Sequence, residues 1–200
     1  MTSFSIPGFD LAAFVSATLD EDLGVGLPGG GRDVTSESVI APDMRFSGVM
    51  DTRHAITVAG LPIAAAFFRK LDPTMEIEIL VPEGGQVGPG TDLMRLSGNA
   101  RAMLTAERSA LNTVQHLSGV ATLTRQYVDA MGNTDCVLLD TRKTIPGLRH
   151  LEKYATRRGR GRQPQPGPYA MFREPCCPEA GGWHLLSARV RSVRSYRPRR

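Results

Sequence analysis

One segment restricts the fold of this chain more than any other: residues 105–132, TAERSALNTVQHLSGVATLTRQYVDAMG, predict a long helix. Its apolar residues recur at intervals of three and four, which is the spacing of one helical face. Those residues are Leu111, Val114, Leu117, Ala121, Tyr127 and Val128. The composition of the chain differs before and after this helix. The residues before the helix, the unit that begins at the helix and the tail are therefore interpreted separately.

The first part, residues 1–104, mixes predicted helices and strands. Asp10 is placed to cap a short helix, and Pro62 falls in the first turn of a second helix, over residues 61–72. Strands are predicted at residues 45–51, 54–60 and 75–81 and within 82–98. These elements follow no regular strand, helix, strand repeat, which favours an α+β domain over a parallel one.

A second unit begins after the long helix. Residues 135–140, DCVLLD, have the composition of a short apolar strand, TRKT forms a turn, and Pro146 lies where a helix ending at Ala155 begins. Strand, charged turn and helix together are typical of a parallel α/β barrel or sheet. In both folds ligands bind at the carboxyl ends of the strands.

The charged turn brings an aspartate, Asp140, and two cations, Arg142 and Lys143, to such a strand end, and Arg149 and Lys153 follow on the helix. A guanidinium binds planar anions with two parallel hydrogen bonds, whereas an ammonium acts as a point charge. This combination suits carboxylates or phosphates. The alternative is a solvated turn on the surface of the protein.

Other chemical signals in the sequence are weaker. Arg108 stands beside Glu107 and is expected to form an exposed pair in the first turn of the long helix, while His116 is expected to be packed or half-exposed. The glycine-rich run GLPGGGR lacks the Lys-Ser/Thr pair of a phosphate-binding loop, and neither a Ser-His-Asp order nor a metal-binding histidine pair is present. The residues by themselves therefore predict an anion-binding α/β protein.

The charge of the chain is distributed very unevenly. Residues 1–155 contain 13 Lys and Arg against 18 Asp and Glu, whereas residues 156–200 contain 11 Arg, no Lys and 2 Glu. The last 45 residues form an Arg-, Pro- and Gly-rich tail, which we predict to be irregular or disordered. The three cysteines suggest neither a disulfide framework nor a zinc site. No run has the apolar length of a membrane helix and no secretory signal is evident, so a cytoplasmic location is expected.

Four segments resemble the quinolinate phosphoribosyltransferase family. They are EDLG, DVTSE, AERSALNTVQHLSGVATLTRQYVDA and LLDTRKTIPGLRHLEKYA, in order and with fitting spacing between about residue 10 and residue 155. The resemblance implies an N-terminal α/β sandwich, here residues 1–104, followed by an open α/β barrel. Residues 105–155 correspond only to the long helix and the first strand-helix unit of that barrel, so the barrel is expected to be incomplete.

The same resemblance implies an activity and a set of site residues. The expected reaction joins quinolinate to phosphoribosyl pyrophosphate with Mg²⁺ and gives nicotinate mononucleotide, pyrophosphate and CO₂. Arg142 is expected to bind quinolinate, Lys143 to lie nearer the phosphates, and Thr141 to contribute to substrate binding. Arg108 is expected to reach the site of a second copy in a homodimer with a shared active site.

After Ala155 the chain departs from the family pattern. The family continues with a glycine-rich turn and a His-Arg pair, but this chain has no histidine between Ala155 and His184 and no lysine after Lys153. We hypothesise a frameshift in a GC-rich coding sequence that truncates the barrel. For the tail, the alternative is a genuine basic extension that binds nucleic acid or an acidic partner, which is less expected than a frameshift because basic tails usually extend complete domains. For the function, the alternatives are a non-catalytic fragment that only dimerises and a related pyrophosphorylase associated with molybdenum transport.

Overall fold

The computed structural model describes residues 4–132 and 137–161. A three-stranded antiparallel sheet has the order β1-β5-β3, formed by β1 (Arg45–Asp51), β5 (Asp92–Asn99) and β3 (Glu76–Ile79). A small second sheet pairs β2 (Ile56–Thr57) with β4 (Gln86–Val87). The helices are α1 (Leu11–Asp22), α2 (Val34–Val39), α3 (Leu61–Leu71), α4 (Ala100–Met131) and α5 (Arg149–Arg158).

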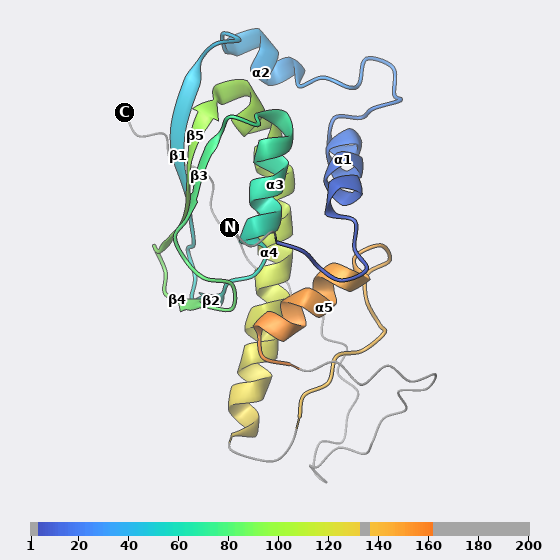
Figure 1. Ribbon diagram of the computed structural model, residues 1–200, viewed down its shortest axis with the longest axis vertical. Coiled ribbons are helices and arrows are strands. Elements are labelled where there is room, and N and C mark those ends of the chain that lie inside the picture. The colour runs from blue at the N-terminus through green and yellow to red at the C-terminus, as the bar shows by residue number, and fades with distance from the viewer. Residues whose placement is uncertain (1–3, 133–136, 162–200) are drawn as a thin grey trace.

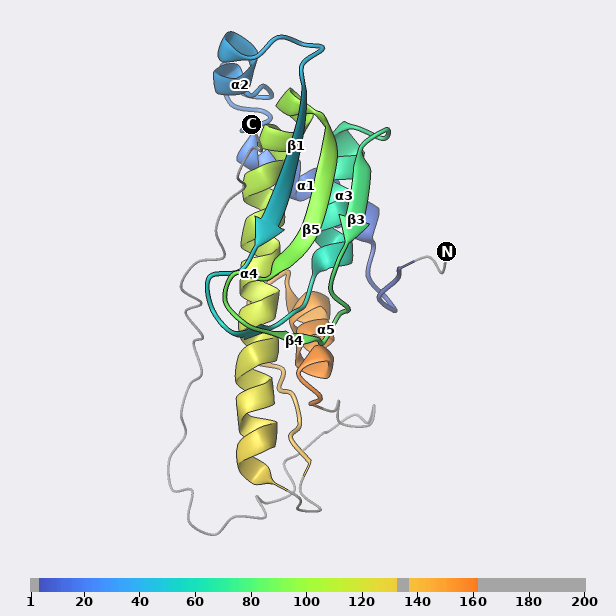
Figure 2. The same ribbon diagram turned by 90° about the vertical axis from the view of Figure 1, so that its left-hand side faces the viewer.

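One face of the three-stranded sheet is covered by α3 and α4, and Figure 2 shows the strands in front of these helices. The register runs continuously along β1 and β5, from Arg45 opposite Asn99 to Met50 opposite Met94. Between the sheet and the helices lies a core of fully buried side chains. It includes Phe67, Phe68, Leu93, Met94 and Met103. The predicted α+β sandwich is therefore confirmed.

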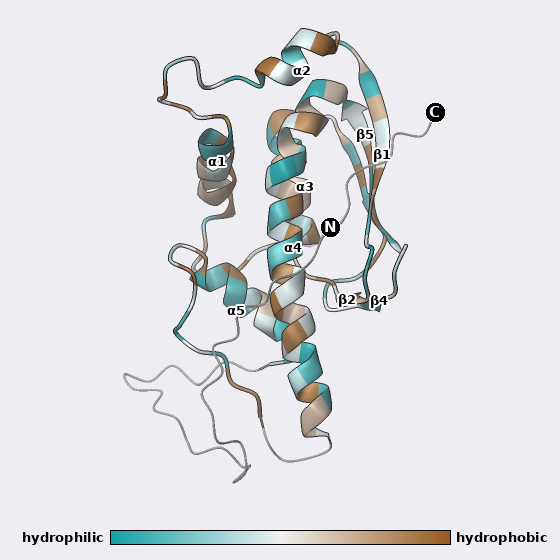
Figure 3. Cartoon of the chain, turned by 180° about the vertical axis from the view of Figure 1, so that it is seen from behind, coloured by the Kyte–Doolittle hydropathy of each residue, from teal (hydrophilic) through white to brown (hydrophobic). Residues whose placement is uncertain are grey.

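The long helix α4 begins at Ala100, five residues before the predicted start. Asn99, the last residue of β5, caps it by accepting a hydrogen bond from the Ala102 N–H at 3.0 Å. Figure 3 shows hydrophobic and hydrophilic residues alternating along α4, as expected of an amphipathic helix. The upper part of α4 packs on α3 and the sheet, whereas α5 crosses the middle of the helix (Figure 1).

Helix α3 has its predicted position, with Pro62 in its first turn, and Asp10 caps α1 as predicted. The strand predicted at 54–60 contains only Ile56 and Thr57. It ends there because the Ala59 N–H bonds the side chain of Ser118 on α4, and Gly60, with φ +103°, turns the chain into α3.

The barrel that the resemblance implies is not closed within the described residues. The predicted strand at 135–140 falls partly on residues 133–136, outside the described ranges, and residues 137–140 belong to neither described sheet. Within residues 137–140 only Leu139 forms a β-bridge, and no strand is formed there. Most of the predicted tail, residues 162–200, also lies outside the described ranges. Within those ranges no helix is long and apolar enough to cross a membrane.

Candidate anion-binding site

The predicted cations Arg142 and Lys143 lie on an exposed turn between α4 and α5, together with Thr141. The Thr141 Oγ1 accepts a hydrogen bond from the Lys143 N–H at 3.1 Å, and the Arg142 carbonyl accepts one from the Thr144 N–H at 3.0 Å. These two hydrogen bonds close a tight turn of the backbone at Arg142 and Lys143. The structure therefore brings Thr141, Arg142 and Lys143 together on one accessible segment.

Three side chains of α5 contact this turn. The Lys153 ammonium donates to Asp140 Oδ1 at 2.7 Å, and the Glu152 Oε2 accepts from the Ile145 N–H at 3.3 Å. The Arg149 Nε donates to the Thr144 hydroxyl at 3.3 Å. Helix α5 begins at Arg149, because the backbone first turns at Gly147, which has φ +83°. It ends at Arg158, beyond the predicted end at Ala155.

Helix α5 is itself fastened to the N-terminal domain through Tyr154. This side chain is 2% exposed and its hydroxyl donates to Glu83, whose two oxygens also accept from the N–H groups of Gly60 and Leu61 at the start of α3. Gly60, the residue at the cap position of α3, has no side chain to accept a hydrogen bond. Glu83 therefore supplies the acceptor and a favourable negative charge. Burial and the neighbouring Glu83 carboxylate raise the pKa of Tyr154. The Arg158 guanidinium lies 4.7 Å from the centre of the tyrosine ring.

The chain remains tightly packed beyond Ala155. At Gly159 an added Cβ would lie 2.4 Å from the Ala121 carbonyl oxygen of α4, so only glycine allows this approach. Gly159 and Gly161 are both buried. The first residues of the predicted tail are thus part of the folded structure.

Arg108 does not join the turn within one chain. It lies in the third turn of α4, not the first, and its side chain pairs with Asp22 of α1 at 3.1 Å. The expected first-turn pair with Glu107 is therefore wrong, because α4 starts earlier than predicted and Asp22 is the partner. Burial raises the pKa of Glu107. Eight residues of helix, about 12 Å along the axis, separate Arg108 from His116, a residue of α4 that contacts Glu152 of α5.

His116 is half-buried, as predicted, and its Nε2 lies 2.9 Å from Glu152 Oε1. Sequence reasoning missed this contact and the one between Glu83 and Tyr154. Both join residues far apart in the chain, 36 and 71 positions respectively, and neither pair has a local spacing signal. What could be read locally is the amphipathic character of the first turns of α5.

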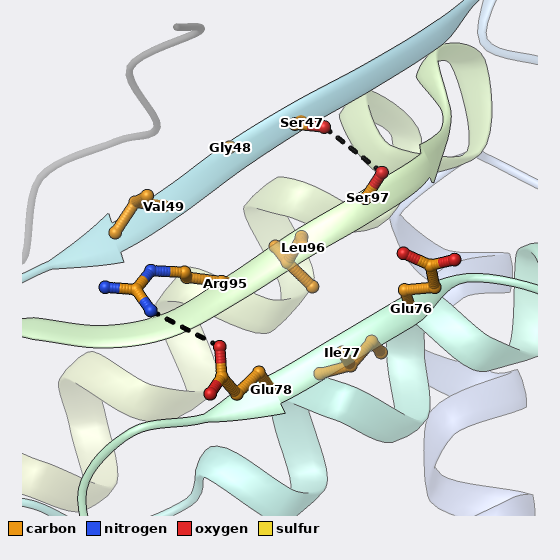
Figure 4. Close-up of a pocket in the computed structure, with 9 residues that line it drawn as sticks. All are labelled: Ser47, Gly48, Val49, Glu76, Ile77, Glu78, Arg95, Leu96 and Ser97. Atoms are coloured by element: carbon orange, nitrogen blue, oxygen red, sulfur yellow. Dashed lines mark hydrogen bonds and ion pairs between the residues drawn. The ribbon is translucent and has the colours of Figure 1, made fainter.

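A separate hollow of about 360 Å³ lies on the open face of the three-stranded sheet. Figure 4 shows the ion pair between Arg95 of β5 and Glu78 of β3, and the hydrogen bond between the hydroxyls of Ser47 and Ser97. Glu76 adds a second carboxylate to the lining. Two carboxylates against one guanidinium disfavour an anionic ligand here, which leaves the turn at 141–143 as the better candidate for one.

Comparison with known proteins agrees with this arrangement. A family model for the quinolinate phosphoribosyl transferase N-terminal domain matches residues 33–118, and the model for the C-terminal domain of the same family matches residues 120–171. Together the two models match most of the chain. The chain belongs to the quinolinate phosphoribosyltransferase family. Its match to the C-terminal model continues past Ala155, in keeping with the packing of Gly159.

Individual members of the quinolinate phosphoribosyltransferase family are similar over different lengths. A chloroplastic nicotinate-nucleotide pyrophosphorylase [carboxylating] of Arabidopsis thaliana is 35% identical over 194 residues, which are 96% of this chain and 53% of that protein. A probable nicotinate-nucleotide pyrophosphorylase [carboxylating] of Synechocystis is 53% identical over 102 residues, 51% of this chain and 35% of the relative.

Among solved structures, NadC from Streptococcus pyogenes superposes with a TM-score of 0.74 at 30% identity. The match covers 82% of this chain and 56% of that one. The chain thus spans between about a third and a little over half of the length of these three relatives. The fold likeness therefore concerns the N-terminal domain, α4 and the unit that carries the cationic turn.

Proposed function

We propose that this chain takes part in the transfer of a phosphoribosyl group from phosphoribosyl pyrophosphate to quinolinate, with loss of CO₂. The products are nicotinate mononucleotide and pyrophosphate. One observation carries the proposal: a chain of this family presents Arg142 and Lys143 side by side on an exposed turn that α5 holds at several points. Both substrates are multiply negative, so a fixed pair of cations suits them.

Each residue of the turn has a role in this proposal. The Arg142 guanidinium binds a carboxylate of quinolinate, and Lys143 lies nearer the pyrophosphate. Thr141 accepts a hydrogen bond from the Lys143 N–H and so fixes the backbone conformation at Arg142. It also contributes to substrate binding. The quinolinate nitrogen bonds to C1 of the ribose while the bond from C1 to the pyrophosphate oxygen breaks. The carboxylate next to the nitrogen then leaves as CO₂, and the ring carbon takes up a proton.

This chemistry needs positioning and charge stabilisation more than a nucleophilic side chain. Cations close to the departing pyrophosphate stabilise the negative charge that develops there. Mg²⁺ is proposed to enter with phosphoribosyl pyrophosphate, because Mg²⁺ commonly binds substrate phosphates with few protein ligands. Among residues 4–132 and 137–161 no three His, Cys, Asp or Glu side chains are grouped to hold a metal, so no step is assigned to a protein-bound ion.

A homodimer with shared sites is also proposed. Arg108 is 74% exposed and stands about two helical turns along α4 from the contact between α4 and α5. This separation favours a role for Arg108 in the site of a second copy. In a twofold dimer each copy would contribute its cationic turn to one site and its Arg108 to the other.

The direct test is an assay of the 200-residue chain for pyrophosphate and nicotinate mononucleotide, with quinolinate, phosphoribosyl pyrophosphate and Mg²⁺. Arg142→Ala is expected to lower kcat/KM at least about a hundredfold, since it removes a charged substrate contact. Arg69→Ala, an exposed arginine at the end of α3, is the matched control and should retain activity. Equal activity of both variants would contradict the assignment of Arg142.

Mixing two inactive variants tests the shared site. Arg108→Ala and Arg142→Ala chains, unfolded and refolded together, should regain about a quarter of the parental activity, because mixed dimers carry one intact site. Mixtures of each variant with itself should stay inactive. If the mixed sample also stays inactive although it is dimeric, Arg108 and Arg142 serve the same chain's site.

A non-catalytic fragment that only dimerises is the second candidate. The chain spans 35% to 56% of the length of the three relatives. This candidate predicts a dimer that forms no product. The same assay, combined with size determination in solution, separates the two candidates.

A further inference from the structure

Two consecutive side chains of α5 hold opposite ends of the cationic turn. Lys153 reaches Asp140 at one end, with 2.7 Å between Nζ and Oδ1, and Glu152 accepts the Ile145 N–H at the other end. Between these two anchors lie Arg142 and Lys143. The side chains of Asp140 and Lys153 are 5% and 19% exposed, so their ion pair is largely shielded from solvent.

The second oxygen of Glu152 contacts a different helix. Oε1 lies 2.9 Å from His116 Nε2 on α4, and the Glu152 side chain is 13% exposed. An ionised carboxylate only accepts hydrogen bonds, so this contact places the hydrogen on Nε2. The contact also fixes the direction of the carboxylate, whose other oxygen then faces Ile145. His116 is held firmly, since Val114 and Leu117 on the same helix are fully buried.

Holding the turn has a consequence for the ligand. Arg142 and Lys143 are exposed on a segment that belongs to no helix or strand, so contacts with other elements have to fix its conformation. An anion site needs its donors held within a fraction of an ångström of their binding positions, or part of the binding energy is lost in ordering the loop. Two anchors only five residues apart supply that order before the ligand arrives.

We propose that Glu152, oriented by His116, and Lys153 are positioning residues for the Arg142–Lys143 pair. None of the three is assigned a contact with substrate. The inference rests on the proposed function, because it assigns these residues a task in anion binding by that same turn. It is distinct from a purely structural role, which would stabilise α5 without changing the affinity of the turn for an anion.

Glu152 gives a cleaner test than Lys153. Asp140 Oδ2 is buried and has no hydrogen-bond partner within the described ranges, so removing Lys153 would leave a buried carboxylate uncompensated and disrupt the turn in other ways. The Glu152→Ala variant removes an acceptor of one backbone N–H. Glu152→Gln keeps an oxygen that can accept from Ile145 and serves as the conservative variant. His116→Leu removes the orienting contact and changes no residue of α5 or of the turn.

The experiment uses the 200-residue chain and two readouts. Hydrogen exchange of the peptide covering residues 140–146 reports the order of the turn, and calorimetric titration with inorganic pyrophosphate and with quinolinate reports anion affinity. Glu78→Ala, an exposed carboxylate on the sheet, is the control. Glu152→Ala is expected to exchange about tenfold faster at the turn and to bind either anion about tenfold more weakly, which corresponds to one hydrogen bond. Exchange in α3 and β5 should not change.

The variants should fall in a fixed order. Glu152→Gln is expected to lie between the parent and Glu152→Ala, and His116→Leu to show the same changes to a smaller degree. Turn exchange or anion affinity in Glu152→Ala equal to that of the control would overturn the inference while leaving the proposed function intact. A parent chain that binds neither anion would instead refute the proposed function, and with it the positioning role. If Glu152→Ala loosens α5 throughout, His116→Leu decides: unchanged anion affinity there overturns the inference.

Discussion

The sheet with α3 and the segment 137–161 both pack on α4, but different forces hold them there. The sheet side is held by buried area, because its strands are paired in register and its fully buried side chains include Phe67, Phe68 and Leu93. The later segment buries only three side chains that α5 contributes, those of Leu151, Tyr154 and Ala155, and adds two ring contacts with the N-terminal residues Phe4 and Phe9. Directional polar contacts, from Glu152 to His116 and from Tyr154 to Glu83, fix its position. The first region therefore tolerates most single polar changes, whereas single residues decide the position of the second.

The largest effect is expected from Phe67→Ala, on the sheet side. Phe67 is fully buried and its ring lies 5.9 Å from that of Phe14 on α1. Deleting such a ring leaves a cavity and should lower the free energy of unfolding by about 3 to 5 kcal/mol. Urea unfolding followed by circular dichroism measures this loss. If the sheet side is held by buried area, the whole described fold should lose stability together. A loss of stability confined to α5 would contradict this comparison.

The next effect concerns the polar attachment of α5. Tyr154→Phe removes the hydroxyl that donates to Glu83 but keeps the ring packed, and it should cost about 1 to 3 kcal/mol. Because the pKa of Tyr154 is raised, the hydroxyl stays a donor throughout the neutral range. Hydrogen exchange should accelerate in α5 and change little in β5. Tyr127→Phe, on the exposed side of α4, is the control. Equal acceleration in β5 and α5 would show that the two regions do not unfold separately.

A smaller effect is expected from a polar contact on the sheet side. The Asp72 side chain accepts hydrogen bonds from the Asn99 N–H at 2.9 Å and from both the N–H and the hydroxyl of Thr74, and these bonds lower its pKa. A depressed pKa in the folded state means that the ionised form adds stability above the unfolded pKa of about 4, and that this stability is lost as the pH falls through the folded pKa. Asp72→Asn should therefore cost about 1 kcal/mol at pH 7 and progressively less below pH 4.

Unfolding curves of the parent and of Asp72→Asn between pH 2 and pH 7 measure this convergence. The exposed Asp43, in the loop before β1, provides the matched control as Asp43→Asn. If the stabilities of the parent and of Asp72→Asn differ by the same amount at every pH, the ionisation of Asp72 does not contribute. The comparison would then be sharpened, because even the charge of a well-bonded carboxylate on the sheet side would contribute little to stability.

Local patterns in the sequence were sufficient for the elements held by burial. The run at 45–51 forms β1 as predicted, and the proline-led run at 61–72 forms α3, because period and turn chemistry act over a few residues. The start of α4 was misplaced because Asn99 was not recognised as its cap, although an asparagine directly before an Ala-rich run was a readable signal. The cap of α2 at Asp33 was missed in the same way.

The candidate site was predictable only in part. The sequence placed Arg142 and Lys143 on a charged turn before a helix, and they lie on such a turn, but residues 137–140 before it form no described strand. Their support could not be foreseen, because Glu83 with Tyr154, and His116 with Glu152, meet only through tertiary packing. The partners of Arg108 depend on the same kind of packing, since Asp22 lies 86 residues away. Directional contacts between distant residues are therefore what a single sequence reveals least.

The smallest effect on stability is expected from Arg108→Ala. The Arg108 side chain is 74% exposed, and an exposed ion pair of this kind contributes no more than about 0.5 kcal/mol. The variant should therefore melt within error of the parent, and the Asp22→Ala variant should do the same. Under the proposed function the two variants differ in activity. Arg108→Ala should lower phosphoribosyl transfer at least about a hundredfold, because a substrate carboxylate loses its partner. Asp22→Ala should retain most of the activity. Parallel melting and kinetic measurements separate the two quantities. Loss of stability and activity together in Arg108→Ala would place this residue with the structural contacts, and Arg142 and Lys143 would remain as the cations of the site.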